Sequence, residues 1–314
     1  MRLGPLPLAA LAAITALAAC TPPEEVPPPA HGDRPIPAPT VSPAPERLIA
    51  LGDVHGDWEA MMNALRLAEV VDDDGAWVGG ETVVVQTGDQ LDRGDTERAI
   101  LETIARLADE AWEAGGALIA LNGNHEAMNV ELDLRYVTEG GFAEFADLAP
   151  PLGDQDAELL SYPEEERGRV FAFRPGGEYA RLLAGQNITV IVGDSAFVHG
   201  GILPAHAEIG LEELNEQVQR WMEGEDDAPD AIDGDGPLWV RDYSDETGPE
   251  ECADLEEVLD ILGVSRMVVG HTVWDSIHSA CDERVWRIDV GMAAYYGGYP
   301  QVLEIRDGEL TIID

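Results

Sequence analysis

One short segment, Gly-Asp-Gln-Leu-Asp-Arg-Gly at residues 88–94, constrains the fold of this chain more than any other. It follows an apolar run at residues 82–85, of the kind that forms a buried strand. Asp89, Asp92 and Arg93 therefore follow the carboxyl end of a strand, where open α/β sheets bind their ligands. Taken alone, the segment fits equally well a solvated turn with a local ion pair. The rest of the chain decides between the two.

Strands alternate with helices from residue 47 onward. Short apolar runs predict strands at 48–51, 82–85, 117–121, 188–192, 195–198 and 266–269, and amphipathic patterns predict helices at 58–70, 96–114, 207–222 and 254–262. Near the C-terminus we expect short strands at 285–290, 301–305 and 310–313. Residues 130–185 are less regular and are interpreted as an insertion beside the site, serving as a lid or a substrate platform. This order predicts a mixed α/β sandwich.

Two segments precede the predicted domain, which spans residues 47–314. Residues 1–20 combine a basic start with a Leu/Ala-rich stretch that ends in Leu-Ala-Ala-Cys, which predicts a secretory signal. This ending resembles a bacterial lipobox, so we expect Cys20 to carry a lipid and to begin the mature chain. A plain signal peptide with an incidental cysteine is the alternative. Residues 21–46 contain ten prolines and predict an extended linker, so the domain is expected outside the cytoplasm, on the periplasmic side or cell envelope.

The other two cysteines, Cys252 and Cys281, lie in the predicted domain. An oxidising compartment would allow them to pair. The sequence does not show whether their backbone positions come close enough, so a disulfide and two free thiols stay open.

The charge of the chain limits its partners. The formal net charge is −44, from 18 basic and 62 acidic residues, which argues against nucleic acid or an anionic membrane surface as the main partner. Such a surface also repels a phosphorylated substrate at long range. Any anion site must therefore create a local positive field, from metal ions or from clustered arginines.

Five predicted strand ends carry residues of the types that ligate metals. They are Asp53 and His55, Asp89 and Asp92, Asn124 and His125, His199, and His271. A single histidine after a strand is more often a hydrogen-bonded structural residue, but five such ends at one sheet edge indicate a site. Oxygen and imidazole donors without a cysteine cluster suit Mn, Fe or Zn. The set is too large for one ion, and Asp89 is placed to bridge two ions that activate a water for phosphate-ester hydrolysis.

Several motifs occur in a fixed order between residues 52 and 272: Gly-Asp-x-His-Gly, Gly-Asp-x-x-Asp-Arg-Gly, Gly-Asn-His-Glu, His-Gly-Gly and Gly-His-Thr. This set resembles the calcineurin-like metallophosphoesterases, and within them the phosphoprotein phosphatase branch. The resemblance implies a sandwich of two mixed β-sheets flanked by helices, with two divalent ions, manganese first and iron or zinc next. It places Asp53, His55 and Asp89 on one ion, and Asp89, Asn124, His199 and His271 on the other.

The same resemblance implies the catalytic roles. His125, paired with Asp92, would protonate the leaving oxygen, and Arg93 would bind phosphate oxygens as a bidentate fork. Residues 124–129, 133–137, 237–241 and 289–292 resemble the Shewanella-like protein phosphatases, in which Arg241 would be a second phosphate arginine. A surface ion pair is the alternative role of Arg241. Residues 291–296 depart from the Ser-Ala-Pro-Asn-Tyr segment of eukaryotic serine/threonine enzymes, so their regulatory subunits and toxin sensitivity are not expected.

The sequence thus predicts a metal-dependent phosphomonoester hydrolase that uses a metal-bridging hydroxide for in-line attack on phosphoproteins or small phosphoesters. Phosphotyrosine and phosphoserine/threonine both stay open as substrates. A diadenosine tetraphosphate or nucleotide phosphatase is the alternative enzyme, since such enzymes share these motifs, although export argues against it. A binding lipoprotein with a degenerate site is the alternative outside enzymes, and the intact set of motifs argues against it.

Overall fold

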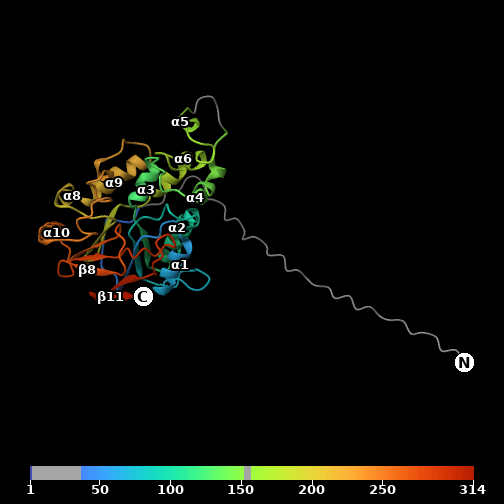
Figure 1. The fold of residues 1–314 in the computed structure, drawn as a ribbon. Coiled ribbons are helices and arrows are strands. Elements are labelled where there is room, and N and C mark those ends of the chain that lie inside the picture. Colours follow the sequence, from blue (N-terminus) through green and yellow to red (C-terminus); the bar gives the residue numbers. More distant parts are fainter. Residues whose placement is uncertain (2–36, 152–156) are drawn as a thin grey trace. The chain divides into compact units, whose positions relative to one another are not determined.

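The computed structural model describes residues 37–151 and 157–314, together with Met1. The predicted signal segment, Cys20 and most of the predicted linker lie outside the described residues. Within the described part, two β-sheets pack between helices, so the predicted mixed α/β sandwich is confirmed (Figure 1). No helix in these ranges is both long enough and apolar enough to cross a membrane.

The first sheet has five strands in the order β11 (Glu309–Ile313), β10 (Val302–Arg306), β2 (Arg47–Leu51), β3 (Val83–Gln86) and β4 (Ala117–Ala120). β2, β3 and β4 run parallel, and β10 joins β2 in the antiparallel direction. Ile49 and Val84 are fully buried, because this sheet is covered on both faces. Uninterrupted apolar runs, without polar alternation, follow from that burial.

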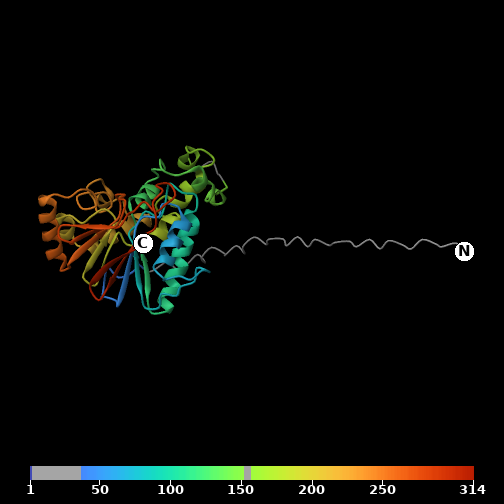
Figure 2. The same ribbon diagram turned by 60° about the horizontal axis from the view of Figure 1, so that its bottom comes forward.

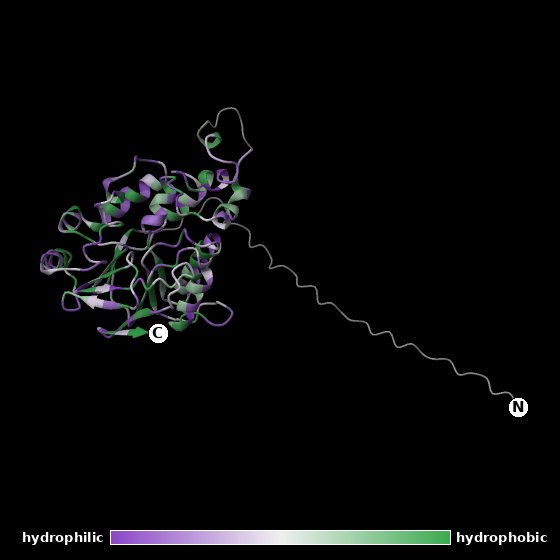
Figure 3. Ribbon diagram, in the orientation of Figure 1, coloured by the Kyte–Doolittle hydropathy of each residue, from purple (hydrophilic) through white to green (hydrophobic). Residues whose placement is uncertain are grey.

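The second sheet has six strands in the order β1 (Val41–Ser42), β5 (Thr189–Val192), β6 (Ser195–Val198), β7 (Arg266–Val269), β9 (Val285–Arg287) and β8 (His278–Ala280). β6, β7 and β9 are parallel. Side chains of both sheets, among them Ile49, Val85, Phe197 and Val268, form one apolar core. Figure 3 shows that the strands of both sheets are predominantly hydrophobic.

Helices cover the outer face of each sheet. α1 (Trp58–Leu67) and α2 (Glu97–Glu113) pack on the five-stranded sheet, and α8 (Pro204–Ile209), α9 (Leu211–Met222) and α10 (Pro249–Leu262) pack on the six-stranded sheet. Figure 2 shows the blue and teal α1 and α2 on one side of the strands and the orange α10 on the other. The predicted insertion contains α4 (Glu139–Ala143), η1 (Ala146–Leu148), α5 (Ala157–Leu160), α6 (Arg167–Phe173) and α7 (Glu178–Leu183), while α3 (Asn124–Val130) precedes it and η2 (Asp230–Ile232) follows α9.

The boundary of the predicted linker is wrong at its C-terminal end. β1 lies within the segment expected to be an extended spacer, and it pairs with β5 in parallel. The amide of Ile191 donates to the Thr40 carbonyl at 2.7 Å, and the Asn187 side chain donates to the Ala38 carbonyl at 2.8 Å. The prolines do not prevent this, because Ala38 and Thr40 contribute carbonyl acceptors and an edge strand tolerates residues that lack an amide hydrogen.

Two helices also differ from the prediction. The helix expected over residues 207–222 is divided into α8 and α9 at Gly210, whose φ of +97° suits glycine and ends a regular helix. α10 begins at Pro249, five residues earlier than expected, because proline is well placed in the first turn and Glu251 caps the amide of Gly248 at 2.8 Å.

The open question about Cys252 and Cys281 has an answer in the structure, where they form a disulfide with their Cα atoms 5.4 Å apart. The bond connects α10 to the residue that follows β8. It closes a loop with a sequence separation of 29, and this loop includes β7 and His271.

We expect replacement of both cysteines by alanine to lower the free energy of unfolding by about 3 to 4 kcal/mol, because the cross-link restricts the unfolded chain. Denaturant unfolding followed by tryptophan fluorescence measures the change. Each single Cys→Ala variant should lose about the same amount as the double variant. Unchanged stability of the double variant in oxidising buffer would contradict the pairing.

Candidate active site

The two sheets bring the predicted ligand residues to one place. Asp53 and His55 follow β2, Asp89 follows β3, Asn124 and His125 begin α3 after β4, His199 follows β6, and His271 follows β7. All of these side chains are buried, and none is more than 9% exposed. Parallel strands place their carboxyl ends at the same sheet edge, so strand direction alone assembles residues that are 218 positions apart in the chain, such as Asp53 and His271.

The backbone of the site loops takes a conformation that few residues other than glycine adopt. His55, Asp89, Asp92, Arg93 and His271 all have φ between +40° and +70°. Such geometry costs free energy and persists only where surrounding contacts enforce it, and it concentrates in functional sites. Five of the ten predicted site residues share it.

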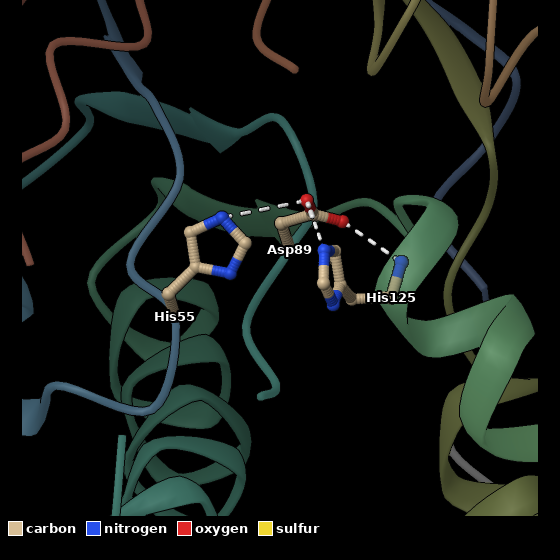
Figure 4. A group of neighbouring side chains, drawn as sticks. All are labelled: His55, Asp89 and His125. Atoms are coloured by element: carbon tan, nitrogen blue, oxygen red, sulfur yellow. Dashed lines mark hydrogen bonds and ion pairs between the residues drawn. The ribbon is translucent and has the colours of Figure 1, made fainter. Parts of the chain in front are cut away.

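Asp89 is the central carboxylate. Figure 4 shows its side chain between the imidazoles of His55, from the loop after β2, and His125, from α3. One of its oxygens accepts the amide of His125 at 3.0 Å, and the other lies 3.6 Å from His55 Nε2 and 3.3 Å from His199 Nε2. Burial opposes its ionisation, but His199, His125 and His55 outweigh that effect and hold the pKa of Asp89 well below its usual value.

Backbone carbonyls fix the orientation of three of the predicted ligand histidines. His55 Nδ1 donates to the Leu91 carbonyl at 3.2 Å, His199 Nδ1 to the Thr87 carbonyl at 3.0 Å, and His271 Nε2 to the Trp239 carbonyl at 3.1 Å. In each neutral ring the other nitrogen is therefore unprotonated and faces the centre of the site. Metal-binding histidines have this arrangement. Burial lowers the pKa of His55 to about 4 and lowers that of His271 strongly, which keeps both rings neutral.

Several nitrogen and oxygen atoms of the site lie within hydrogen-bond distance of one another. His199 Nε2 lies 3.1 Å from His271 Nδ1 and 2.8 Å from the Asn124 side-chain oxygen. The neutral His271 ring presents the lone pair of Nδ1 and Asn124 presents its carbonyl oxygen, both toward His199 Nε2, and the Asp89 carboxylate adds a negative charge. A metal cation at their centre would satisfy all four. Asp89, His199 and His271 form one candidate metal cluster, and His55, Asp89 and His125 form another.

Two buried carboxylates lie beside the first cluster. Asp53 accepts the amide of His271 at 3.1 Å, and burial, Asp289 and Asp89 raise its pKa well above the usual value. Burial also raises the pKa of Asp289 to about 6, and one oxygen of Asp289 is buried without a partner among the described residues. A cation next to Asp53 would supply the positive charge that these carboxylates lack.

Glu126 and Asp289 were not among the predicted site residues, and both lie in the site. The Glu126 carboxylate accepts the amides of Asp89, Gln90 and Leu91 at 2.8 to 3.0 Å, so it shapes the loop that carries Asp89. Burial raises its pKa to about 7, with Asp89 the next contribution. The position of Glu126 in the Gly-Asn-His-Glu motif was the available signal.

The structure also assembles the predicted acid pair. Asp92 is fully buried, and one of its oxygens accepts from His125 Nδ1 at 2.5 Å. This bond leaves Nε2 of His125 facing Asp89, 3.8 Å from its carboxylate. Burial lowers the pKa of His125, but Asp89 and Asp92 outweigh it and raise that pKa above its ordinary value.

The two predicted phosphate arginines lie in different surroundings. The Arg93 guanidinium is half-buried among three tyrosine rings, with centroids 4.5 Å (Tyr136), 5.0 Å (Tyr295) and 5.4 Å (Tyr296) away. Arg93, His55 and Tyr295 line a cavity of about 570 Å³. Arg241 is exposed and donates to the His271 carbonyl at 3.3 Å and to Thr272 Oγ1 at 2.6 Å.

The fold and the candidate metal site together indicate a protein family. Residues 46–275 match the model of the family described as calcineurin-like phosphoesterase. The chain belongs to this family and is a metal-dependent phosphoesterase hydrolase. The resemblance inferred from the sequence motifs is thereby confirmed.

Individual proteins show which members of the family this chain resembles. Shewanella-like protein phosphatase 2 of Arabidopsis thaliana is 41% identical over 295 residues, covering 83% of this chain and 75% of that protein. Shewanella-like protein phosphatase 1 of Plasmodium berghei is 28% identical over 283 residues, covering 85% and 74%. Among solved structures, the cold-active protein-tyrosine phosphatase of a psychrophilic Shewanella species matches with a TM-score of 0.72 and 26% identity, covering 88% of this chain and 80% of that one.

Asp89 and Asp92 should respond differently to the same substitution. Asp89→Asn removes the charge around which the unprotonated acceptors gather, so bound metal should fall to less than half of the unaltered protein's content. Asp92→Asn should keep its metal and lose about 10²- to 10⁴-fold in turnover, because the orientation of His125 is lost. Elemental analysis of dialysed protein and steady-state kinetics provide the two measurements. Equal metal loss in both variants would contradict this division.

Proposed function

We propose that this chain is a two-metal phosphomonoesterase that acts on phosphoproteins, with phosphotyrosine as the preferred residue. The observation that carries the proposal is the group of imidazole nitrogens and oxygens around Asp89, which two divalent cations would satisfy. Three tyrosine rings beside Arg93 and the adjoining cavity suit an aromatic phosphoester. The Shewanella relative in the comparison is a protein-tyrosine phosphatase by name.

The metal-binding roles follow from the donor set. Asp53, His55 and Asp89 would hold one divalent ion, and Asp89, Asn124, His199 and His271 the other, with manganese the first choice and iron or zinc next. When bound, such ions polarise a phosphate ester and lower the pKa of a coordinated water. The cations also supply the positive field that the acidic surface lacks.

Two arginines would orient the substrate. The Arg93 Nε is buried without a partner among the described residues, so this guanidinium has donors free for phosphate oxygens. The rings of Tyr136 and Tyr295 lie against it and restrict its position, which reduces the entropy lost on binding. Arg241 would contact the phosphate from the side of His271.

His125 would protonate the leaving oxygen. Asp92 accepts its Nδ1 hydrogen and holds the ring so that Nε2 is directed into the site. Asp89 and Asp92 raise the pKa of His125, which favours the protonated imidazole that a general acid needs.

A substrate panel tests the proposed function. We expect the manganese-loaded protein to hydrolyse 4-nitrophenyl phosphate and a phosphotyrosine peptide faster than a phosphoserine peptide, and all three faster than diadenosine tetraphosphate. His199→Asn serves as the inactive control, since it removes a predicted ligand. Faster turnover of diadenosine tetraphosphate would replace the proposal with a nucleotide phosphatase. If the protein has its full metal content but hydrolyses none of these substrates, it is a binding protein and the proposed function is wrong.

We further propose that the chain is exported and attached to a bacterial membrane through a lipid on Cys20. The basic start, the apolar stretch and the Leu-Ala-Ala-Cys ending of residues 1–20 support this. Expression of the full chain and of Cys20→Ala in a bacterial host, followed by membrane fractionation and mass spectrometry of the mature N-terminus, tests it. We expect only the unaltered chain in the membrane fraction, and identical fractionation of the two would contradict the anchor.

A further inference from the structure

One arginine of the segment 130–185 lies in the interior of the protein, next to the His125–Asp92 pair. Arg169 lies on α6, and its side chain is fully buried. Its guanidinium lies against the rings of Phe145 and Phe173, with centroids 5.2 Å and 4.9 Å away. A buried guanidinium is costly unless every one of its hydrogens has a partner.

Arg169 meets that requirement with five donors. Nε donates to the Asn129 side-chain oxygen at 2.8 Å. The two terminal nitrogens form a fork on the Glu97 carboxylate, and their remaining hydrogens reach the Gly141 carbonyl at 3.1 Å and an Asp92 oxygen at 3.5 Å. A lysine has three donors and cannot form this pattern.

These contacts hold the Asp92 carboxylate in place beside the His125 ring. One oxygen of Asp92 accepts from His125 Nδ1, while the other accepts from the Asn129 amide at 3.1 Å and from Arg169. The Asp92 backbone amide donates to the same Glu97 carboxylate that Arg169 holds. The side chain and the backbone of Asp92 are therefore both connected to Arg169.

The charges also indicate that Arg169 holds Asp92 in position. The carboxylates of Asp92 and Glu97 lie close together, and both residues are fully buried. Arg169 compensates one of these charges, which leaves a single negative charge facing the His125 ring. Without Arg169, two uncompensated carboxylates would repel each other in a medium of low dielectric constant, and Asp92 would move.

We propose that Arg169 is a positioning residue for the His125 general acid, acting through Asp92 and Glu97. The segment 130–185 is then part of the catalytic apparatus rather than only a lid or platform. This inference rests on the proposed function, because it requires His125 to protonate the leaving oxygen. It extends that function by naming a residue outside all of the sequence motifs.

Three variants separate positioning from folding. Arg169→Lys keeps the charge and loses the fork, and Arg169→Met removes both. Glu97→Gln combined with Arg169→Met avoids an unpaired Glu97 and keeps the test available if Arg169→Met does not fold. Arg167→Met is the matched control, since Arg167 lies on the same helix, is half-buried, and its side chain donates to the Tyr162 carbonyl at 3.0 Å, away from Asp92 and Glu97.

The dependence of turnover on the leaving group is the decisive kinetic measurement. A general acid matters most for a basic leaving group, so we expect Arg169→Lys and the double variant to lose about 10- to 100-fold in kcat on phenyl phosphate. On 2,4-dinitrophenyl phosphate, whose leaving group needs no proton, kcat should stay close to that of the unaltered protein. Metal content should not change, and Arg167→Met should behave as the unaltered protein on both esters. An equal loss on both esters would overturn the positioning role.

A second measurement does not require activity. A short Nδ1–H···O bond gives a strongly deshielded imidazole proton in the ¹H NMR spectrum, which we expect in the unaltered protein and Arg167→Met and not in the Arg169 variants. Retention of this signal in the Arg169 variants overturns the inference. Inactivity of the unaltered metal-loaded protein, or equal losses of His125→Asn on both esters, instead overturns the proposed function or its acid step.

Discussion

The close packing of carboxylate, imidazole and amide side chains around Asp89 is the constraint on which the rest of this structure depends. Imidazoles fixed by backbone carbonyls, the Asn124 oxygen and the Asp89 carboxylate all direct electron density at one region. Such an arrangement is unfavourable unless a cation occupies its centre. The fold sustains it by burial, by the Glu126 bonds to the loop and by two sheets whose strand ends meet there.

Much of the fold and the grouping of the candidate ligand residues could be predicted from the sequence, because both depend on short-range patterns. Apolar runs buried on both faces give β2, β3 and β4, and each delivers its polar loop at the same edge. Spacing within a loop is local information, so the sequence directly predicts that His55 lies near Asp53. The helix break at Gly210 could not be predicted, since a single glycine within an amphipathic pattern is compatible with a continuous helix.

Partners that are distant in sequence were not predictable in this way. Arg169 acts on residues 72 and 77 positions away, and nothing in the pattern around it distinguishes it from neighbouring surface arginines. The same limit hid β1, where a proline-rich composition indicated a spacer although only carbonyl acceptors were needed for pairing with β5. The pairing of Cys252 with Cys281 likewise depends on the packing of α10 against the sheet.

The positive φ angles of His55, Asp89, Asp92, Arg93 and His271 have a consequence for how this site can diverge. At these positions the backbone disfavours bulky and above all β-branched residues, whatever their chemistry. Substitution of one candidate ligand type by another is therefore easier at Asp53, Asn124 and His199, where the backbone imposes no such restriction. Among descendants of this sequence, changes in metal preference should accumulate at those three positions while the loops around them keep their shape.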